Sequence, residues 1–184
     1  MQVQTKNYVD IASRFRELGH RVPVGIALLP GNFSTAVNVR EFCFHAATPH
    51  VRSAWQDIGL EDEGPLGTSP KSKVESPKSM TGDEQVPLAV FFGAGLLDGP
   101  AWRLTVALGL VSSVLASHSR NAGRREVRVD VVVERPRGHG YVCIKYQGDA
   151  FGIVALGREV RRIRADNQSY PRQESLVVSR EQLE

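Results

Sequence analysis

Alternating apolar and polar positions between residues 126 and 164 predict two strands and a helix. One face of the first strand is made of valines at every second position, Val127, Val129, Val131 and Val133. After a turn at 135–140, the alternation resumes at Val142 and Ile144. A helix follows, in which apolar residues recur at helical spacing, Ile153, Leu156, Val160 and Ile163. Period-2 patterns indicate half-buried strands, and a period near 3.6 indicates a helix with one buried face.

The same criteria extend this region into a C-terminal lobe at 87–166 with the order β-α-β-β-α. A buried strand is predicted at 87–92, because the segment is apolar and glycines of a turn follow it. The helix after it, at 98–117, is apolar on nearly every side, so it must be covered on several sides. Its uncharged run is shorter than the roughly 20 residues needed to span a bilayer.

Residues 1–59 predict a smaller lobe with the order α-β-(β)-α. A helix at 8–18 has its apolar residues on one face, a buried strand follows at 22–29, and 41–45 is interpreted as a short strand. Thr48, followed by a proline, then begins a second helix. Together the two lobes predict an α+β fold in which a mixed sheet is covered by helices.

Between the lobes, residues 60–86 show no sustained apolar period. The segment holds three prolines, many Ser and Thr residues and mixed charge. Such a composition buries too little apolar surface to offset the entropy of ordering the chain. We therefore expect a flexible linker at 60–86. Residues 167–184 are interpreted as a polar tail, in which 176–178 could dock as a short strand.

Composition places the chain among ordinary globular proteins. Hydrophobic residues make up 41% and charged residues 23%, and the formal net charge is +3, so nothing indicates disorder throughout. The two cysteines do not suggest a disulfide framework. The first residues lack the basic-then-apolar order of a signal peptide. We therefore expect a cytoplasmic protein.

Positive charge is concentrated on the last predicted helix. Four arginines lie opposite its apolar face, Arg158, Arg161, Arg162 and Arg164. Guanidinium groups at this spacing form a compact cationic surface that suits phosphate or carboxylate. No aromatic residue is interleaved with them for stacking on bases. They are a candidate surface for an anion or an acidic partner, although favourable interaction with the helix C-terminus also explains several of them.

The sequence contains no complete catalytic or metal-binding motif. Cys43 and His45 are the single close pair of a nucleophile and a base, but two such residues on one strand can equally be a packed strand end. A zinc site would require Cys43, His45, His139 and Cys143 to meet, and their spacing is not the usual one for zinc ligands. We expect no metal, no cofactor and no catalytic residue.

The order of elements over residues 98–164 resembles that of a known class of proteins. An apolar helix is followed by the alternating run 127–131, a turn, a second strand and a closing helix. In this order and in its hydropathy, the segment resembles the small effector-associated components of bacterial conflict systems. The resemblance implies a module that tethers or positions effectors and carries no catalytic residues.

The leading expectation is therefore a non-catalytic adaptor or accessory subunit that acts through protein–protein contacts, in bacterial defence or signalling. The helix at 98–117 needs more cover than one sheet supplies, which predicts a dimer or a complex with another protein. The expected contact residues are Leu104, Leu108, Val111 and Leu115. A nucleic-acid-associated regulator that uses the arginines is the first alternative, and a small enzyme that uses Cys43 and His45 is the second.

Overall fold

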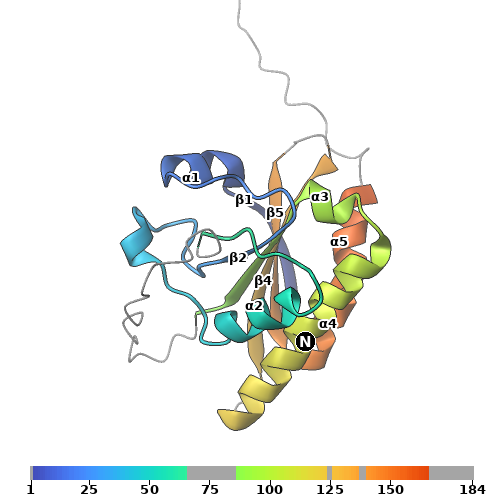
Figure 1. Ribbon diagram of the computed structural model, residues 1–184. Helices are drawn as coiled ribbons and strands as arrows, with labels where there is room; N and C mark the ends of the chain where they lie inside the picture. Colours follow the sequence, from blue (N-terminus) through green and yellow to red (C-terminus); the bar gives the residue numbers. More distant parts are fainter. Residues whose placement is uncertain (1, 66–85, 124–125, 137–139, 166–184) are drawn as a thin grey trace, which may run out of the picture.

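The computed structural model describes residues 2–65, 86–123, 126–136 and 140–165, which form one mixed sheet with helices on both faces (Figure 1). The strands are β1 (Gln2–Tyr8), β2 (Ile26–Leu29), β3 (Leu88–Phe92), β4 (Val127–Glu134) and β5 (Tyr141–Gly148). The α-helices are α1 (Ile11–Glu17), α2 (Thr48–Gln56), α3 (Ala94–Leu97), α4 (Ala101–Asn121) and α5 (Leu156–Ala165). The described 3₁₀ helices are η1 (Val39–Glu41) and η3 (Ala150–Ala155). The predicted α+β fold, a mixed sheet covered by helices, is confirmed.

The sheet has the strand order β1-β5-β4-β3-β2. Among these five strands only the central pair, β3 and β4, is parallel. A parallel pair needs a crossover connection, and α3 and α4 supply it. The lobe predicted at 1–59 contributes the two edge strands, β1 and β2, while the lobe predicted at 87–166 contributes the three strands between them. Strands from both segments therefore belong to one sheet.

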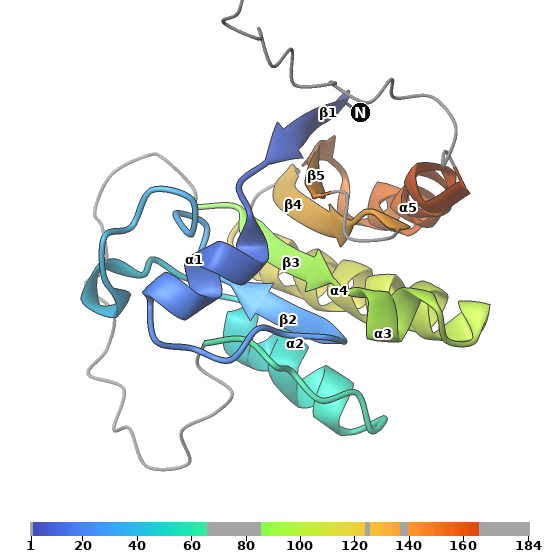
Figure 2. The ribbon, with the colours of Figure 1, turned by 90° about the horizontal axis from the view of Figure 1, so that it is seen from above.

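One face of the sheet is covered by α2, α4, η3 and α5 (Figure 2). The alternating valines of β4 belong to this buried cluster, because a period of two places every second side chain on the same face. Trp55 of α2 is fully buried here, and its Nε1 donates a hydrogen bond to the Ala107 carbonyl oxygen 3.2 Å away. Helix α4 is apolar on several sides because it packs on the sheet, on α2 and on α5. No helix in the described ranges is both long enough and apolar enough to cross a membrane.

The other face is covered in part by α1 and by the loop at 30–45. Phe15 of α1, Phe33 of the loop and Phe91 of β3 are buried together, and the ring centroids of Phe15 and Phe33 are 5.0 Å apart. Cys143 of β5 is buried in the same cluster. This second core fixes the loop at 30–45 against the sheet.

The N-terminal segment differs from its prediction. Residues 2–8 form the edge strand β1, and the helix expected at 8–18 begins only at Ile11. The Asp10 carboxylate caps that helix by accepting a hydrogen bond from the Ser13 amide, 3.1 Å away. Hydrophobic periodicity missed β1 because Val3 is the only apolar residue among its first six.

The prediction of a short strand at 41–45 is wrong. Glu41 is the last residue of η1, and residues 42–45 follow it in irregular backbone. Asn32 holds them in place: its Oδ1 accepts from the Cys43 amide at 2.9 Å, and its Nδ2 donates to the Glu41 carbonyl at 2.8 Å. Side-chain hydrogen bonds of this kind satisfy the backbone without a strand partner.

The beginning of the linker expected at 60–86 is packed against β2. Asp62 is buried, and its Oδ1 accepts from the Leu28 amide at 2.8 Å. Its Oδ2 accepts from Arg52 Nε at 2.7 Å, so the segment is tied to α2 as well. Asp62 also forms a parallel bridge with Ile26 of β2.

Glu63 extends this attachment by one residue. Its carboxylate accepts from the Val24 amide at 2.5 Å and from the Gly25 amide at 3.1 Å. The carboxylates of Asp62 and Glu63 thus accept hydrogen bonds from backbone amides in and just before β2, as the carbonyl groups of a neighbouring strand would. A search for apolar periodicity does not detect an attachment of this kind. The rest of the expected linker, at 66–85, and the predicted tail at 167–184 lie outside the described residues.

Candidate functional site

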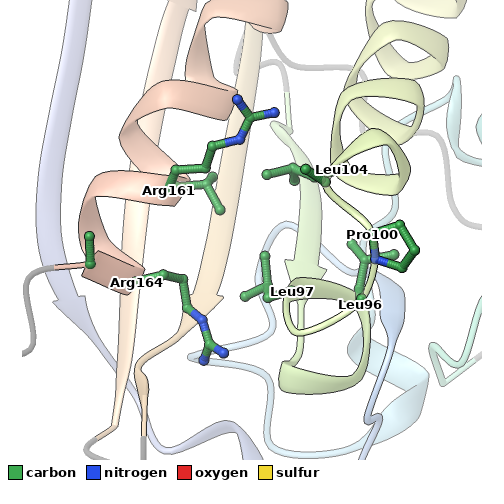
Figure 3. A pocket seen from close by; sticks show the side chains of 10 residues that line it. Leu96, Leu97, Pro100, Leu104, Arg161 and Arg164 are labelled. Atoms are coloured by element: carbon green, nitrogen blue, oxygen red, sulfur yellow. The ribbon is translucent and has the colours of Figure 1, made fainter.

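A cavity of about 310 Å³ lies between α5 on one side and α3 with the start of α4 on the other (Figure 3). We call it the arginine groove. Its apolar lining includes Leu96, Leu97, Pro100 and Leu104. Arg161 and Arg164 of α5 supply its charged groups. The two arginines project from α5 toward the gap, and Leu97 and Leu104 face them from the opposite side.

The amphipathic pattern of α5 explains this arrangement. Leu156 and Val160 are buried against the core, which fixes the rotation of the helix. Arg161 and Arg164 are three residues apart, so they lie on the same face, at the side where α5 meets α3 and α4.

The two arginines have unequal partners. Arg164 forms an ion pair with Asp98, which precedes α4. The Arg164 side chain is 19% exposed and that of Asp98 is 64% exposed, so this carboxylate is largely in water. Arg161 Nη2 donates to the Thr105 hydroxyl at 3.0 Å, which leaves its charge without a carboxylate in the described part of the chain. The groove therefore carries a net positive charge.

An exposed aromatic residue lies next to the groove in sequence. Trp102 directly follows the lining residue Ala101 and is 56% exposed. The guanidinium carbon of Arg103 is 6.0 Å from the centroid of its ring, which is within the range of a cation–π interaction. The start of α4 thus combines exposed apolar surface with further positive charge.

The arginines predicted as one surface are divided by the structure. Arg161 and Arg164 line the groove, whereas Arg158 and Arg162 do not. Arg158 is exposed, and Arg162 pairs with Glu159 at 2.8 Å on the solvent side of α5. Sequence spacing identified the charged helix, but the position of α3 and α4 determines which arginines share a cavity.

The four predicted contact residues of α4 are not on the surface. Leu104, Leu108, Val111 and Leu115 are 5%, 0%, 0% and 1% exposed. They are covered by the sheet and by neighbouring helices of the same chain, so they cannot form a contact surface while the fold is intact. Leu104 alone among them also lines the groove. The dimer itself stays a prediction, and it needs a different surface.

The cysteines and histidines are not arranged as a reactive or metal-binding cluster. Cys43 Sγ donates to the Glu41 carbonyl at 3.4 Å, while His45 Nδ1 accepts from the Ala47 amide at 3.0 Å. Cys143 lies in β5 and is buried in the core between the sheet and α1. His139 is outside the described residues, and the described ranges contain no group of three or more His, Cys, Asp or Glu placed to hold a metal ion.

A second, more polar cavity of about 270 Å³ lies on the part of the sheet that α1 leaves open. It is lined mainly by polar and charged side chains of β1, β4 and β5, among them Gln4, Arg128, Asp130 and Lys145. Lys145 Nζ is 3.6 Å from Asp130 Oδ2. Desolvation nevertheless raises the pKa of the Asp130 carboxyl, since burial outweighs the attraction of the lysine. Sequence reasoning missed this cavity, because its residues come from three strands that are distant along the chain.

A scan against protein-family models, a search of curated proteins and a search of solved structures each found no match to this chain.

Proposed function

We propose that this chain is a non-catalytic adaptor or accessory subunit that binds a partner protein through the arginine groove. The observation that supports this most is the combination of two guanidinium groups with an apolar lining in one open cavity (Figure 3). An effector-positioning module of a bacterial conflict system, as the resemblance of residues 98–164 implies, would be one adaptor of this kind.

The chemistry of the groove favours an acidic segment that also carries an aliphatic side chain. A carboxylate can accept two parallel hydrogen bonds from an arginine. Within the described ranges the side chain of Arg161 bonds to a neutral hydroxyl group, that of Thr105, which a carboxylate could replace. Leu97 and Leu104 would cover the aliphatic group. A cavity of about 310 Å³ has room for one or two side chains rather than for a large ligand.

The arrangement of the thiols favours a role without covalent chemistry. Burial, with a smaller contribution from the nearby Asp130 carboxylate, raises the pKa of the Cys143 thiol to about 12. The thiolate is the nucleophilic form of cysteine, so Cys143 is unreactive at neutral pH. Cys43 and His45 each bond to backbone groups of their own loop, which gives no support to the alternative of an enzyme that uses this pair.

Peptide selection on the purified chain provides the test. A display library of random ten-residue peptides is expected to yield peptides that combine Asp or Glu with an aliphatic residue. Binding of a selected peptide is then measured by fluorescence anisotropy for the wild-type chain, for Arg161→Gln in the groove and for Arg158→Gln as a matched control on the same helix. Loss of a charge-assisted hydrogen bond should weaken binding about tenfold or more for Arg161→Gln. The control should bind within about twofold, because an exposed charge outside the groove contributes little.

Equal affinities of the Arg161→Gln variant and the wild-type chain would contradict this proposal. The nucleic-acid alternative has a different signature. It predicts that a labelled single-stranded oligonucleotide binds, that Arg158→Gln and Arg161→Gln weaken this binding by similar factors, and that affinity falls steeply with salt.

A further inference from the structure

The two edge strands of the sheet, β1 and β2, differ in what lies along their outer sides. Along β2, Asp62 forms a bridge with Ile26, and the Glu63 carboxylate accepts hydrogen bonds from the amides just before the strand. Along β1 no described strand or helix lies on the outer side (Figures 1 and 2). Five of the seven β1 residues are exposed, and their pairing with β5 is continuous from Gln2 to Tyr8. An edge strand of this length with no neighbour among the described residues is a template for another strand.

The register determines which backbone groups of β1 point outward. The Arg135 amide donates to the Gly140 carbonyl at 2.9 Å, and this pair continues the β4–β5 register. Hydrogen-bonded pairs alternate along an antiparallel ladder, so the even-numbered residues of β5 bond to β4 and the odd-numbered ones bond to β1. Their partners in β1 are Gln2, Gln4, Lys6 and Tyr8. The N–H and C=O groups of Val3, Thr5 and Asn7 therefore point away from the sheet.

These three residues are spaced symmetrically about Thr5. If a second β1 runs antiparallel with Thr5 opposite Thr5, then Val3 of each copy lies opposite Asn7 of the other. Every outward N–H and C=O group of both strands then meets a partner, which gives about six hydrogen bonds. The pattern of outward groups on β1 is thus complementary to itself.

The side chains are compatible with this register. Lys6 is the only charged residue of β1, and it lies opposite Gln4 of the other strand, so no like charges are placed directly opposite each other. Val3 packs at the margin of the main core, and Thr5 faces its own copy. Threonine and valine favour strands.

We propose that two copies of this chain associate through their β1 strands, antiparallel and centred on Thr5, so that one sheet continues across both copies. This surface is separate from the arginine groove, and it replaces the buried leucines of α4 as the site of the expected dimer. The proposal does not depend on the proposed function.

Thr5→Pro is the sharpest single change. The Thr5 amide points outward, so proline in both copies removes two hydrogen bonds between the copies, one from each. It removes none between β1 and β5, and proline is tolerated at such edge positions. Light scattering after size exclusion should report about twice the 20.2 kDa chain mass for the wild-type chain at high concentration. Thr5→Ala, which keeps the amide, should behave in the same way. Thr5→Pro should be monomeric, with its dissociation constant raised at least about tenfold.

A charge swap tests the register itself. Thr5→Lys and Thr5→Asp each place like charges directly opposite each other, so each variant alone should be monomeric. An equal mixture of the two should recover the dimer, because the introduced lysine of one copy would then face the introduced aspartate of the other. A monomeric wild-type chain at about 100 µM would overturn the proposal, as would a dimer that survives Thr5→Pro. Failure of the mixture to associate would overturn the register, and would indicate another strand as the partner of β1.

Discussion

Replacement of Asp62 by alanine tests whether the segment after α2 is fixed to the sheet. The Asp62 side chain is fully buried, and its carboxylate accepts three hydrogen bonds. The donors are the amides of Leu28 and Gly64, at 2.8 and 2.9 Å, and Arg52 Nε, at 2.7 Å. Alanine would leave the Leu28 amide without its acceptor and the Arg52 charge without its partner.

The magnitude follows from these contacts. Removing one partner of a buried, hydrogen-bonded ion pair costs about 3–5 kcal/mol, mainly because the other charge remains buried. The Arg52 side chain is 21% exposed, so water can solvate part of its guanidinium group. We therefore expect Asp62→Ala to lower the free energy of unfolding by about 3 kcal/mol, at the lower end of that range. Asp62→Asn keeps an acceptor for the two amides and should cost less, about 1–2 kcal/mol.

Urea unfolding monitored by tryptophan fluorescence provides the assay, since Trp55 is buried in α2, the helix that carries Arg52. The slope of the free energy against urea should stay unchanged while the midpoint falls. Glu61→Ala is the matched control, because Glu61 is exposed and adjacent, and it should stay within about 0.5 kcal/mol of the wild type. If Asp62→Ala costs no more than this control, the segment is not held by the contacts described, and the reasoning fails.

Two further predictions concern titrating groups on the α1 side of the sheet. Burial raises the pKa of the Cys143 thiol to about 12. A thiol reagent at about pH 8 should therefore label Cys43 alone in the folded chain and both thiols in urea. Rapid labelling of two thiols without urea would contradict this prediction. Desolvation raises the pKa of Asp130 in the folded state, so its contribution to stability is present at acid pH and is lost as pH rises through the folded-state pKa. Asp130→Asn should therefore melt a few degrees above the wild type at about pH 8, and this advantage should vanish below the pKa of an unfolded aspartate, near pH 4. Thermal melts of both proteins at the two pH values measure this difference in melting temperature. An Asp130→Asn variant that melts lower than the wild type at about pH 8 would contradict the prediction, and would show that the ion pair with Lys145 outweighs desolvation.

The elements with strong apolar periodicity were predictable from the sequence. The β4–β5 hairpin, β3, α4 and α5 each bury a face that recurs at the period of the element, so the pattern and the structure agree. Strand β1 and residues 60–65 were missed for a common reason. Their positions are fixed by backbone pairing and by carboxylate–amide hydrogen bonds, and neither requires apolar residues at regular intervals.

The candidate site was predictable only in part. Spacing identified the arginines of α5, but it could not indicate that Arg161 and Arg164 line a cavity with α3 and α4 while Arg158 and Arg162 lie outside it. The leucines of α4 were assigned to an interface because their helix is apolar on several sides. Hydrophobic periodicity indicates how much of a helix surface must be buried, but it does not indicate which chain buries it. In this structure the sheet and helices of the same chain bury α4.

The pairing of β1 with β5 has a consequence for how the chain folds during synthesis. Strand β1 is the first of the described strands to be synthesised. Its partner β5 is the last of them, since Gln2 pairs with Gln147, so β1 is among the last strands to find its neighbour. At typical elongation rates of about 5–20 residues per second, roughly 7 to 28 seconds pass between the synthesis of β1 and that of β5. Contacts between such distant residues also slow folding, since a large loop must close before they form. Because β1 lies at the edge of the sheet and pairs with the late strand β5, its addition is expected to be the final step in completing the sheet.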